Sequence, residues 1–390
     1  MYSLSKQIAA IQFPPISEVK NWLTGRSFPA ERPLVDLCQA VPSYPPALSL
    51  VSYLQQVVAE PATACYSPDE GLPEVREAVA DALTWQYAGQ VDAGQVCLTI
   101  GASQAFWLAM LCLCQPGDEV IVPLPAYFDH PMGLAAMGVT PVWAEFSAER
   151  RGLPDVAELA RLMTERTRAL LLVSPSNPTG AIIPPEQFEQ LLVLARNQRI
   201  ALVVDETYNA FVPGDEPPHR LFQRQDWPEH FIHIASFGKT FALTGFRAGA
   251  LVGHPELIHQ ALKIQDSMAV CQPRITQLAV AYGCRQLADW VAAQKAQMLR
   301  RHDRFVEEFE APGNAFELVA SGGFFAWVRH PWRGLDGRSA CRRLIEEASL
   351  ICLPGEAFGP GQSGYLRLAF GNLADEGIGA AVERFRQLQV

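Results

Sequence analysis

One lysine stands where a buried strand is expected to end, a position in which its amine could react. Lys239 lies in the segment SFGKT, directly after the apolar run FIHIA. Burial and neighbouring cations at such a site lower the pKa of a lysine, as an imine-forming amine requires. The chain contains five lysines, and no other follows an apolar run in this way. Lys239 is therefore the candidate nucleophile, with a solvated surface lysine as the alternative.

Two phosphate-binding motifs match the chain only in part. Residues 238–240 read Gly-Lys-Thr, the end of a P-loop, but that motif needs a glycine at position 233, where the chain has His233. Residues 359–364 satisfy G-x-G-x-x-G, yet they precede the strand-like run YLRLAF instead of following a strand and opening a helix. The sequence therefore predicts neither a P-loop nor a dinucleotide site, and residues 359–364 are expected to form a loop.

Polar residues near two other apolar runs could serve a pyridine-based cofactor. Asp205 ends the run ALVVD, where a carboxylate could pair with a protonated ring nitrogen, as in enzymes that use pyridoxal 5′-phosphate (PLP). Tyr208, in the same DETY segment, and Asn177, in SPSNPTG, could donate hydrogen bonds to the phenolic oxygen of such a ring. Taken singly, these residues could equally form a cap and a turn.

Three further features could bind anions. The turn at residues 101–104 joins the run VCLTI to a helical pattern, and the N–H groups and dipole of a helix start favour phosphate. Arg247, eight residues after Lys239, could add charge to the same phosphate and lower the pKa of the lysine. Arg367 lies in the alternating run YLRLAF, where its guanidinium could hold a carboxylate through two parallel hydrogen bonds or form a structural ion pair.

These residues need a sheet whose strand ends meet at one edge. Between residues 96 and 254, short apolar runs alternate with helical patterns, which predicts an α/β fold with a mostly parallel seven-stranded sheet. The expected strands are 96–100, 119–124, 140–146, 169–175, 201–206, 231–237 and 249–254. In such sheets, ligands bind outside the carboxyl ends of the strands.

The chain divides into three expected parts. Residues 1–44 are expected to form an N-terminal arm and part of a small domain, 45–275 the large PLP-binding domain, and 276–390 a small C-terminal α+β domain. The last part should begin with a long helical stretch around 276–310 and continue through FELVASGGFFAWVR, a helix near 338–348 and the strands ICLPG and YLRLAF.

Composition narrows the possible partners. The 390 residues are 49% hydrophobic and carry a formal net charge of -10, which disfavours nucleic acid and anionic membranes as partners. No apolar run is long enough to span a membrane, and we expect a cytoplasmic protein. Nine scattered cysteines favour a reducing compartment, and the pair Cys112 and Cys114 lacks a second pair at zinc spacing, so no metal is expected.

In their order along the chain, these segments resemble the fold-type I PLP-dependent enzymes, specifically the class I and II aminotransferase family. The resemblance extends from about residue 36 to 385. It rests most strongly on SNPTG, DETY, SFGKT followed by GFRAG, and YLRLAFG.

The resemblance implies a role for each candidate. Lys239 would form the Schiff base with PLP and Asp205 would pair with the pyridinium, while Asn177 and Tyr208 would bind the ring oxygen. Arg367, with Asn177, would bind the substrate carboxylate. The implied phosphate ligands are Ala102, Ser103, Gln104, Ser236 and Arg247. Tyr127 would stack on the ring, and His130 would support the aspartate.

Two further implications concern the subunit partner and the pocket. Tyr66 matches a tyrosine that reaches the phosphate in the neighbouring subunit, which implies a homodimer with shared active sites. Ala40, in DLCQAVP, stands where family members commonly have a glycine, and its methyl group brings more bulk to the backbone beside the substrate carboxylate. This departure bears on the size of the substrate more than on the type of reaction.

The expected function is transfer of an amino group from an amino acid to a 2-oxo acid by a ping-pong mechanism through Lys239. A PLP-dependent C–S lyase or another eliminating enzyme is the alternative, because the same fold and residues support both reactions. A non-catalytic module that binds an effector or DNA is the less favoured third hypothesis, since the chain has no basic segment for DNA.

Overall fold

A computed structural model describes residues 2–388 and contains the predicted seven-stranded sheet. The sheet order is β2-β8-β7-β6-β5-β3-β4, and only β8 runs antiparallel to its neighbours. The strands are β2 (Val96–Ile100), β3 (Glu119–Pro123), β4 (Thr140–Ala144), β5 (Thr167–Val173), β6 (Ala201–Asp205), β7 (Phe231–Ser236) and β8 (Ala248–Val252). The α/β fold and its mostly parallel sheet are therefore confirmed.

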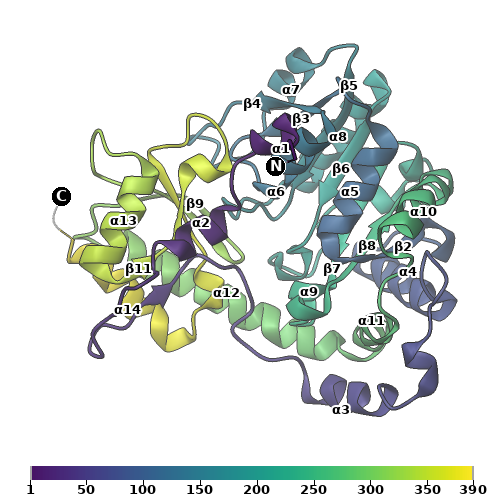
Figure 1. Ribbon diagram of the computed structural model, residues 1–390, viewed down its shortest axis with the longest axis horizontal. Helices are drawn as coiled ribbons and strands as arrows, with labels where there is room; N and C mark the ends of the chain where they lie inside the picture. Colours follow the sequence, from purple (N-terminus) through teal and green to yellow (C-terminus); the bar gives the residue numbers. More distant parts are fainter. Residues whose placement is uncertain (1, 389–390) are drawn as a thin grey trace.

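Helices cover both faces of this sheet (Figure 1). Alternate residues of a strand point to opposite faces, so Val120 and Val122 pack in one apolar cluster while Ile121 packs in another. On the first face lie α5 (Gly101–Leu113), α6 (Asp129–Met137) and α10 (Pro255–Ala269). On the second lie α3 (Leu48–Val57), α4 (Pro73–Tyr87), α7 (Val156–Leu162), α8 (Pro185–Gln198) and α11 (Arg274–Gln286).

The C-terminal part forms a second layer of sheet and helices. A four-stranded antiparallel sheet has the order β12-β13-β10-β9, with β9 (Glu317–Gly322), β10 (Phe325–Arg329), β12 (Leu353–Pro354) and β13 (Tyr365–Leu368). Its helices are α12 (Ala288–Glu310), α13 (Gly337–Ala348) and α14 (Asp375–Arg386). Strand β1 (Val35–Asp36) pairs in parallel with β11 (Leu350–Ile351), so the N-terminal part contributes to this layer.

The expected helical stretch at 276–310 is two helices. Leu287 separates α11 from α12, and its buried side chain packs with the apolar cluster of the large sheet. Ala279 and Val280 of α11 belong to the same cluster, whereas Phe305 and Phe309 of α12 pack in the C-terminal part. The three-part division at residues 44 and 275 stays a prediction, although the packing groups α11 with the large sheet.

The N-terminal residues run along both parts of the molecule. Helix α1 (Lys6–Ala9) lies beside α6 (Figure 1), and α2 (Pro15–Asn21) contacts β12. Within residues 2–388, no helix has the length and apolar character that crossing a membrane demands.

Two glycines bring the SNPTG loop against the C-terminal sheet. A Cβ atom added to Gly322, at the end of β9, would lie 2.2 Å from the carbonyl oxygen of Gly180. Backbone atoms cannot yield as a flexible side chain can, so this approach depends on glycine. The loop that carries Asn177 is thereby held close to β9.

We expect Gly322→Ala to lower the free energy of unfolding by about 1–3 kcal/mol, because the added methyl group forces the two backbones apart. Gly364→Ala is the matched control, since a Cβ there meets no atom within 4 Å. Thermal unfolding followed by calorimetry should separate the two variants. Equal midpoints would show that the contact between Gly180 and Gly322 contributes nothing to stability.

Candidate active site

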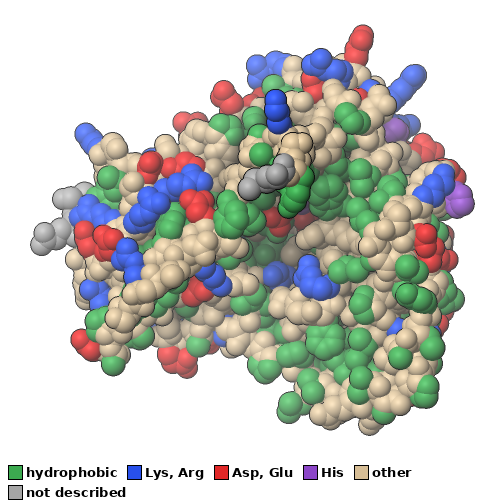
Figure 2. Space-filling view, in the orientation of Figure 1, with side chains coloured by type: hydrophobic (Ala, Val, Ile, Leu, Met, Phe, Trp, Pro, Cys, Tyr) green, Lys and Arg blue, Asp and Glu red, His purple; other side chains and the backbone are tan. Residues whose placement is uncertain are grey.

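A cavity of about 1060 Å³ lies at the carboxyl ends of β5, β6 and β7. The N-terminal residues and the C-terminal part close its other sides, and Figure 2 shows it as a hollow between the two parts of the molecule. Apart from Gln104 and Tyr66, every predicted site residue lines it: Ala40, Ala102, Ser103, Tyr127, Asn177, Asp205, Tyr208, Ser236, Lys239, Arg247 and Arg367. The fold thus collects residues from segments far apart in the sequence.

Lys239 lies on α9 (Phe237–Thr240), a single helical turn that follows β7. Its Nζ donates a hydrogen bond of 2.5 Å to the backbone carbonyl of Ala40. Burial, together with the charges of Arg247 and Arg367, lowers the pKa of Lys239 from 10.5 to about 8. A sizeable fraction of this amine is therefore neutral near physiological pH, as a nucleophile or a base requires.

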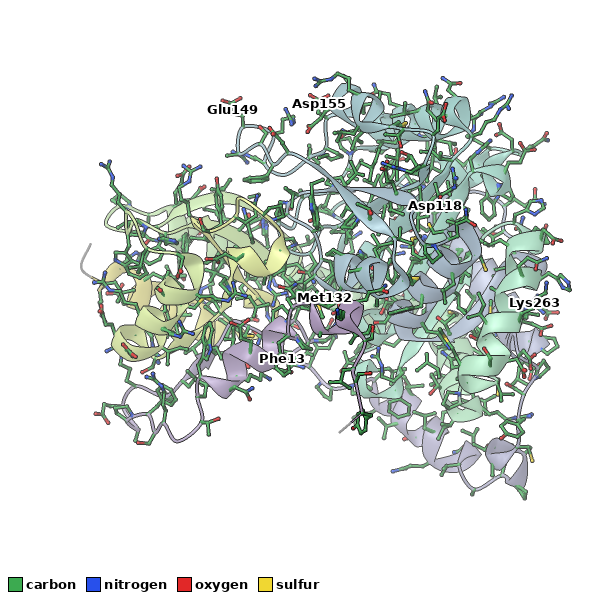
Figure 3. The ribbon with its side chains drawn as sticks, turned by 45° about the horizontal axis from the view of Figure 1, so that its top comes forward. Phe13, Asp118, Met132, Glu149, Asp155 and Lys263 are labelled. Atoms are coloured by element: carbon green, nitrogen blue, oxygen red, sulfur yellow. The ribbon has the colours of Figure 1, made fainter. Side chains whose placement is uncertain are left out.

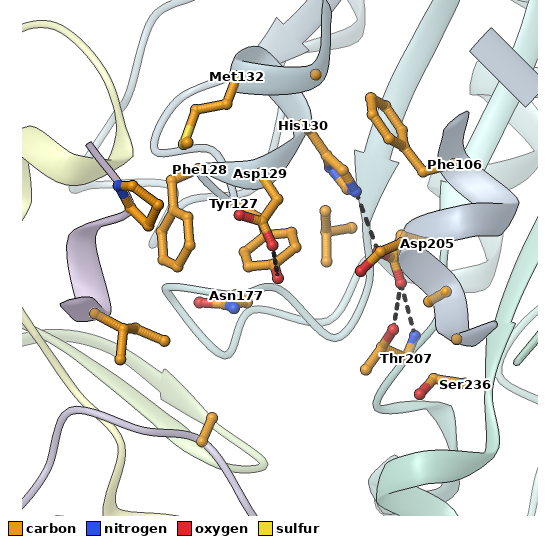
Figure 4. A pocket seen from close by; sticks show the side chains of 18 of the residues that line it. Phe106, Tyr127, Phe128, Asp129, His130, Met132, Asn177, Asp205, Thr207 and Ser236 are labelled. Carbon is orange, nitrogen blue, oxygen red and sulfur yellow. Dashed lines mark hydrogen bonds and ion pairs between the residues drawn. The ribbon is translucent and has the colours of Figure 1, made fainter. Parts of the chain in front are cut away.

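Asp205 ends β6 and is held on both carboxylate oxygens (Figure 4). Its Oδ1 accepts hydrogen bonds from the backbone N–H of Thr207 at 3.0 Å and from the Thr207 hydroxyl at 2.6 Å. Its Oδ2 lies 3.2 Å from Nε2 of His130, whose ring stacks on Phe106. The contact between His130 and Asp205 that the family resemblance implies is thus present.

Thr207 was missed in the sequence. The sequence pattern that could have identified it is local: a threonine two residues after an aspartate can form a hydrogen-bonded turn on that carboxylate. Thr207 fixes the orientation of Asp205 within the cavity, which both residues line.

Arg367 lies on β13 and is 1% exposed, while Leu366 and Leu368 are buried in an apolar cluster. Its Nη1 donates to Oδ1 of Asn177 at 3.1 Å, and its Nη2 donates to the carbonyl of Cys38. Its Nε has no partner among the described residues. The amide oxygen of Asn177 thus accepts from Arg367, and the residue, whose amide N–H₂ is a donor, lines the cavity.

The start of α5 and Arg247 form an end of the cavity suited to an anion. Gly101 has φ +75°, and Ala102 and Ser103 follow in the first helical turn, whose N–H groups lack partners within the helix. Ser236 and Arg247 line the same cavity. A Cβ on Gly249 of β8 would lie 2.4 Å from the carbonyl carbon of Gly101, so this glycine lets the helix start approach the sheet.

Gln104 does not line the cavity. Its side chain folds back along α5, and its Oε1 accepts a hydrogen bond of 2.7 Å from the backbone N–H of Ile100. That N–H precedes the helix and would otherwise need another acceptor. The residue therefore stabilises the turn that presents Ala102 and Ser103.

The two cavity tyrosines are held differently, and a third lies outside. Tyr208 is buried against the rings of Phe324 and Phe325, and burial raises the pKa of its hydroxyl. The Tyr127 hydroxyl donates to Asp129, and burial together with that carboxylate raises its pKa (Figure 4). Tyr66 lies outside the cavity and is 80% exposed.

A buried network lies behind Asp205, on the other face of β6. The Glu206 carboxylate accepts a hydrogen bond from Tyr87 at 3.0 Å and lies 2.9 Å from His219 Nε2 and 2.6 Å from His233 Nδ1. Burial opposes the charged form of Glu206, but the two histidines outweigh it and lower the pKa of Glu206 to about 2. The network joins β6 to β7 and so fixes the strand end that carries Asp205.

The residues present fit PLP, the cofactor that the resemblance implies. Lys239 supplies an amine of lowered pKa, Asp205 an oriented carboxylate, and Arg247 with the start of α5 a site for phosphate. The aldehyde, the ring nitrogen and the phosphate of PLP therefore each have a partner in one cavity.

Comparisons with known proteins agree with this chemistry. The family model "Aminotransferase class I and II" matches residues 32–385. An aromatic aminotransferase of Arabidopsis thaliana, ISS1, is 26% identical, with 98% of this chain and 95% of that protein covered. An aspartate aminotransferase of Streptomyces avermitilis is 30% identical over 92% of this chain and 90% of its own length. The solved aspartate aminotransferase of Thermus thermophilus with maleate has a TM-score of 0.90 and 28% identity, covering 99% of this chain and 100% of that one.

We expect the Lys239 amine of the cofactor-free protein to react with acetic anhydride as a group of pKa about 8. Because only the neutral amine reacts, the labelling rate should rise with pH through a midpoint near that value. Mass spectrometry of the peptide that contains Lys239 gives the rate. The same peptide in denaturant is the control and should show a midpoint near 10.5. The same midpoint in the folded and the denatured protein would exclude a lowered pKa of Lys239.

Proposed function

The chain belongs to the aminotransferase class I and II family and is a PLP-dependent aminotransferase, and from this premise we propose that Lys239 carries the transfer. The observation that supports this role is the buried Lys239 amine, with a pKa of about 8, in one cavity with Asp205 and Arg367. The substrates are an amino acid and a 2-oxo acid. The relatives are named aminotransferases, and nothing favours the eliminating alternative.

When bound, PLP supplies an aldehyde that condenses with amines and a ring that takes up the electron pair released at the substrate Cα. Asp205 would keep the ring nitrogen protonated, because its carboxylate is oriented by Thr207 and His130. Tyr208 and the amide N–H₂ of Asn177 would donate to the ring oxygen, and Tyr127 would cover the face of the ring.

Lys239 would move the proton at the substrate Cα. Its neutral form is the base, and burial, together with the charges of Arg247 and Arg367, favours that form. Arg367 would hold the substrate carboxylate, since it is buried and its Nε lacks a partner among the described residues. A held carboxylate leaves the Cα–H bond in a fixed orientation relative to the base.

Ala40 would affect both the Lys239 amine and the room left for the substrate. Its backbone carbonyl accepts the Lys239 hydrogen bond, and its side chain lines the cavity. A substrate that enters must take over the space near this carbonyl, so the methyl group of Ala40 would limit the bulk that fits there.

We also propose a homodimer in which Tyr66 completes the phosphate site of the partner. Two observations support this. Tyr66 matches the family tyrosine that reaches the phosphate in the neighbouring subunit, and burial of its 80% exposed side chain at an interface would be favourable. Ala102, Ser103, Ser236 and Arg247 would supply the remaining contacts. A cytoplasmic location, in keeping with the composition and the scattered cysteines, also stays a proposal.

We expect Lys239→Ala to lower kcat/KM by at least about 10³-fold, because the variant lacks both the amine and the base. Lys263→Ala, on the exposed side of α10, is the control. Borohydride reduction should leave the cofactor covalently attached to the peptide with Lys239 in the unchanged protein. A Lys239→Ala chain that still retains reduced cofactor would contradict the assignment.

We expect Tyr66→Phe to weaken PLP binding. When Tyr66→Phe chains are mixed with Lys239→Ala chains, we expect some dimers to contain one intact active site. In a mixed dimer, one site combines the intact Lys239 of the first chain with the intact Tyr66 of the second. After subunit exchange, titration of the mixture with PLP should recover a tight-binding, active fraction. Activity equal to the sum of the separate variants would exclude a shared site.

A further inference from the structure

The cavity has an apolar wall beside the substrate carboxylate site. Phe128, 4% exposed, packs in a cluster with the half-buried side chains of Ile16 and Met132. Ile11 and Phe13 of the N-terminal residues also line the cavity. Figure 4 shows Met132 and Phe128 facing the N-terminal chain, and Figure 3 labels Phe13 and Met132. We call these five residues the apolar wall.

The apolar wall lies within reach of a substrate bound to Arg367. Phe358 connects the two, because its ring centroid is 5.4 Å from the guanidinium carbon of Arg367 and 5.6 Å from the ring centroid of Phe128. Phe358 itself is buried, but Arg367 and Phe128 line the same cavity, so an amino acid whose carboxylate is on Arg367 shares that cavity with the apolar wall.

The charges in the cavity do not suit a second carboxylate. The cations that line it, within the part of the chain that the structure describes, are Lys239, Arg247 and Arg367. Each has a role in the proposed function: base, phosphate partner and partner of the α-carboxylate. Asp129, which also lines the cavity, adds a negative charge on the helix that carries Met132. Within one chain, a side-chain carboxylate buried here would lack a partner of opposite charge, which is costly.

The N-terminal contribution to the wall is held in place from both sides. Gln7 donates to the carbonyls of Ala135 and Ala136 on α6, at 2.7 and 3.0 Å. Gln12 donates to the carbonyl of Ala357 at 3.2 Å, in the C-terminal part. Ile11 lies between these two glutamines in the sequence and is thus positioned over the cavity.

We propose that the amino donor of this enzyme carries a large apolar or aromatic side chain, which packs on the apolar wall, and not a side-chain carboxylate. This inference rests on the proposed function, because it takes Arg367 as the partner of the α-carboxylate. The wall, and not a second cation, selects the substrate.

Binding of unreactive analogues to the PLP-loaded enzyme tests the inference without catalysis. Calorimetric titration should show that 3-phenylpropionate binds at least about tenfold more tightly than succinate, which carries a second carboxylate. In the half-reaction followed by absorbance, kcat/KM for phenylalanine should exceed that for aspartate by about a hundredfold. Tighter binding of succinate or faster reaction of aspartate would overturn the inference and leave the aminotransferase function intact. Reaction with no amino acid at all would instead overturn the function, while the titration would still decide the preference.

Paired variants test the place of the side chain. Met132→Lys adds a cation to the wall, and Met132→Gln is the control of similar length without charge. We expect succinate to bind at least about tenfold more tightly to the first variant than to the second. Ile11→Lys with Ile11→Gln repeats the test on a half-buried residue outside the helices, in case the helix variant does not fold. Equal succinate binding within both pairs would show that the substrate side chain does not lie at the apolar wall.

Discussion

Arg367 is a buried cation that joins three parts of the chain. Its two terminal nitrogens donate to the Cys38 carbonyl, near the N-terminus, and to Asn177, after β5, while the residue itself belongs to β13. A buried guanidinium is costly unless its N–H groups are satisfied, so the three segments must meet at this point. The position of the C-terminal part against the large sheet, and hence the closed side of the cavity, depends on that requirement.

Strand β6 shows how one sheet serves both chemistry and support. Asp205 is the last residue of β6, and Glu206, the next residue, continues the pairing with β7 because its N–H donates to the carbonyl of Ile234. The two adjacent side chains therefore face opposite sides. Asp205 lies among Thr207 and His130 at the cavity, whereas Glu206 lies among Tyr87, His219 and His233 in the interior. Two carboxylates of the same chemistry thus receive different roles from their surroundings alone.

Much of the fold and of the site could be predicted from sequence, because both depend on local patterns. The seven strands are apolar runs bounded by turns, and Lys239, Asp205 and Arg367 follow or occupy such runs. The parts that were missed depend on contacts that form only in the folded chain. Gln104 has the right position for a phosphate ligand, but its side chain bonds to Ile100. The packing of α11 on the large sheet and the contact of Gly180 with Gly322 have no local signal, since each partner alone resembles an ordinary helix or glycine.

The N-terminal residues of the apolar wall have a consequence for evolution. Phe13 is 61% exposed, and Ile11 lies in a stretch outside the regular helices, so substitutions there disturb little of the core. Asp205 and Arg367, by contrast, are buried on strands, where a substitution disturbs the core more. On the proposed role of the apolar wall, substitutions of its exposed residues would change which amino acids related chains accept, while the transfer chemistry would stay the same.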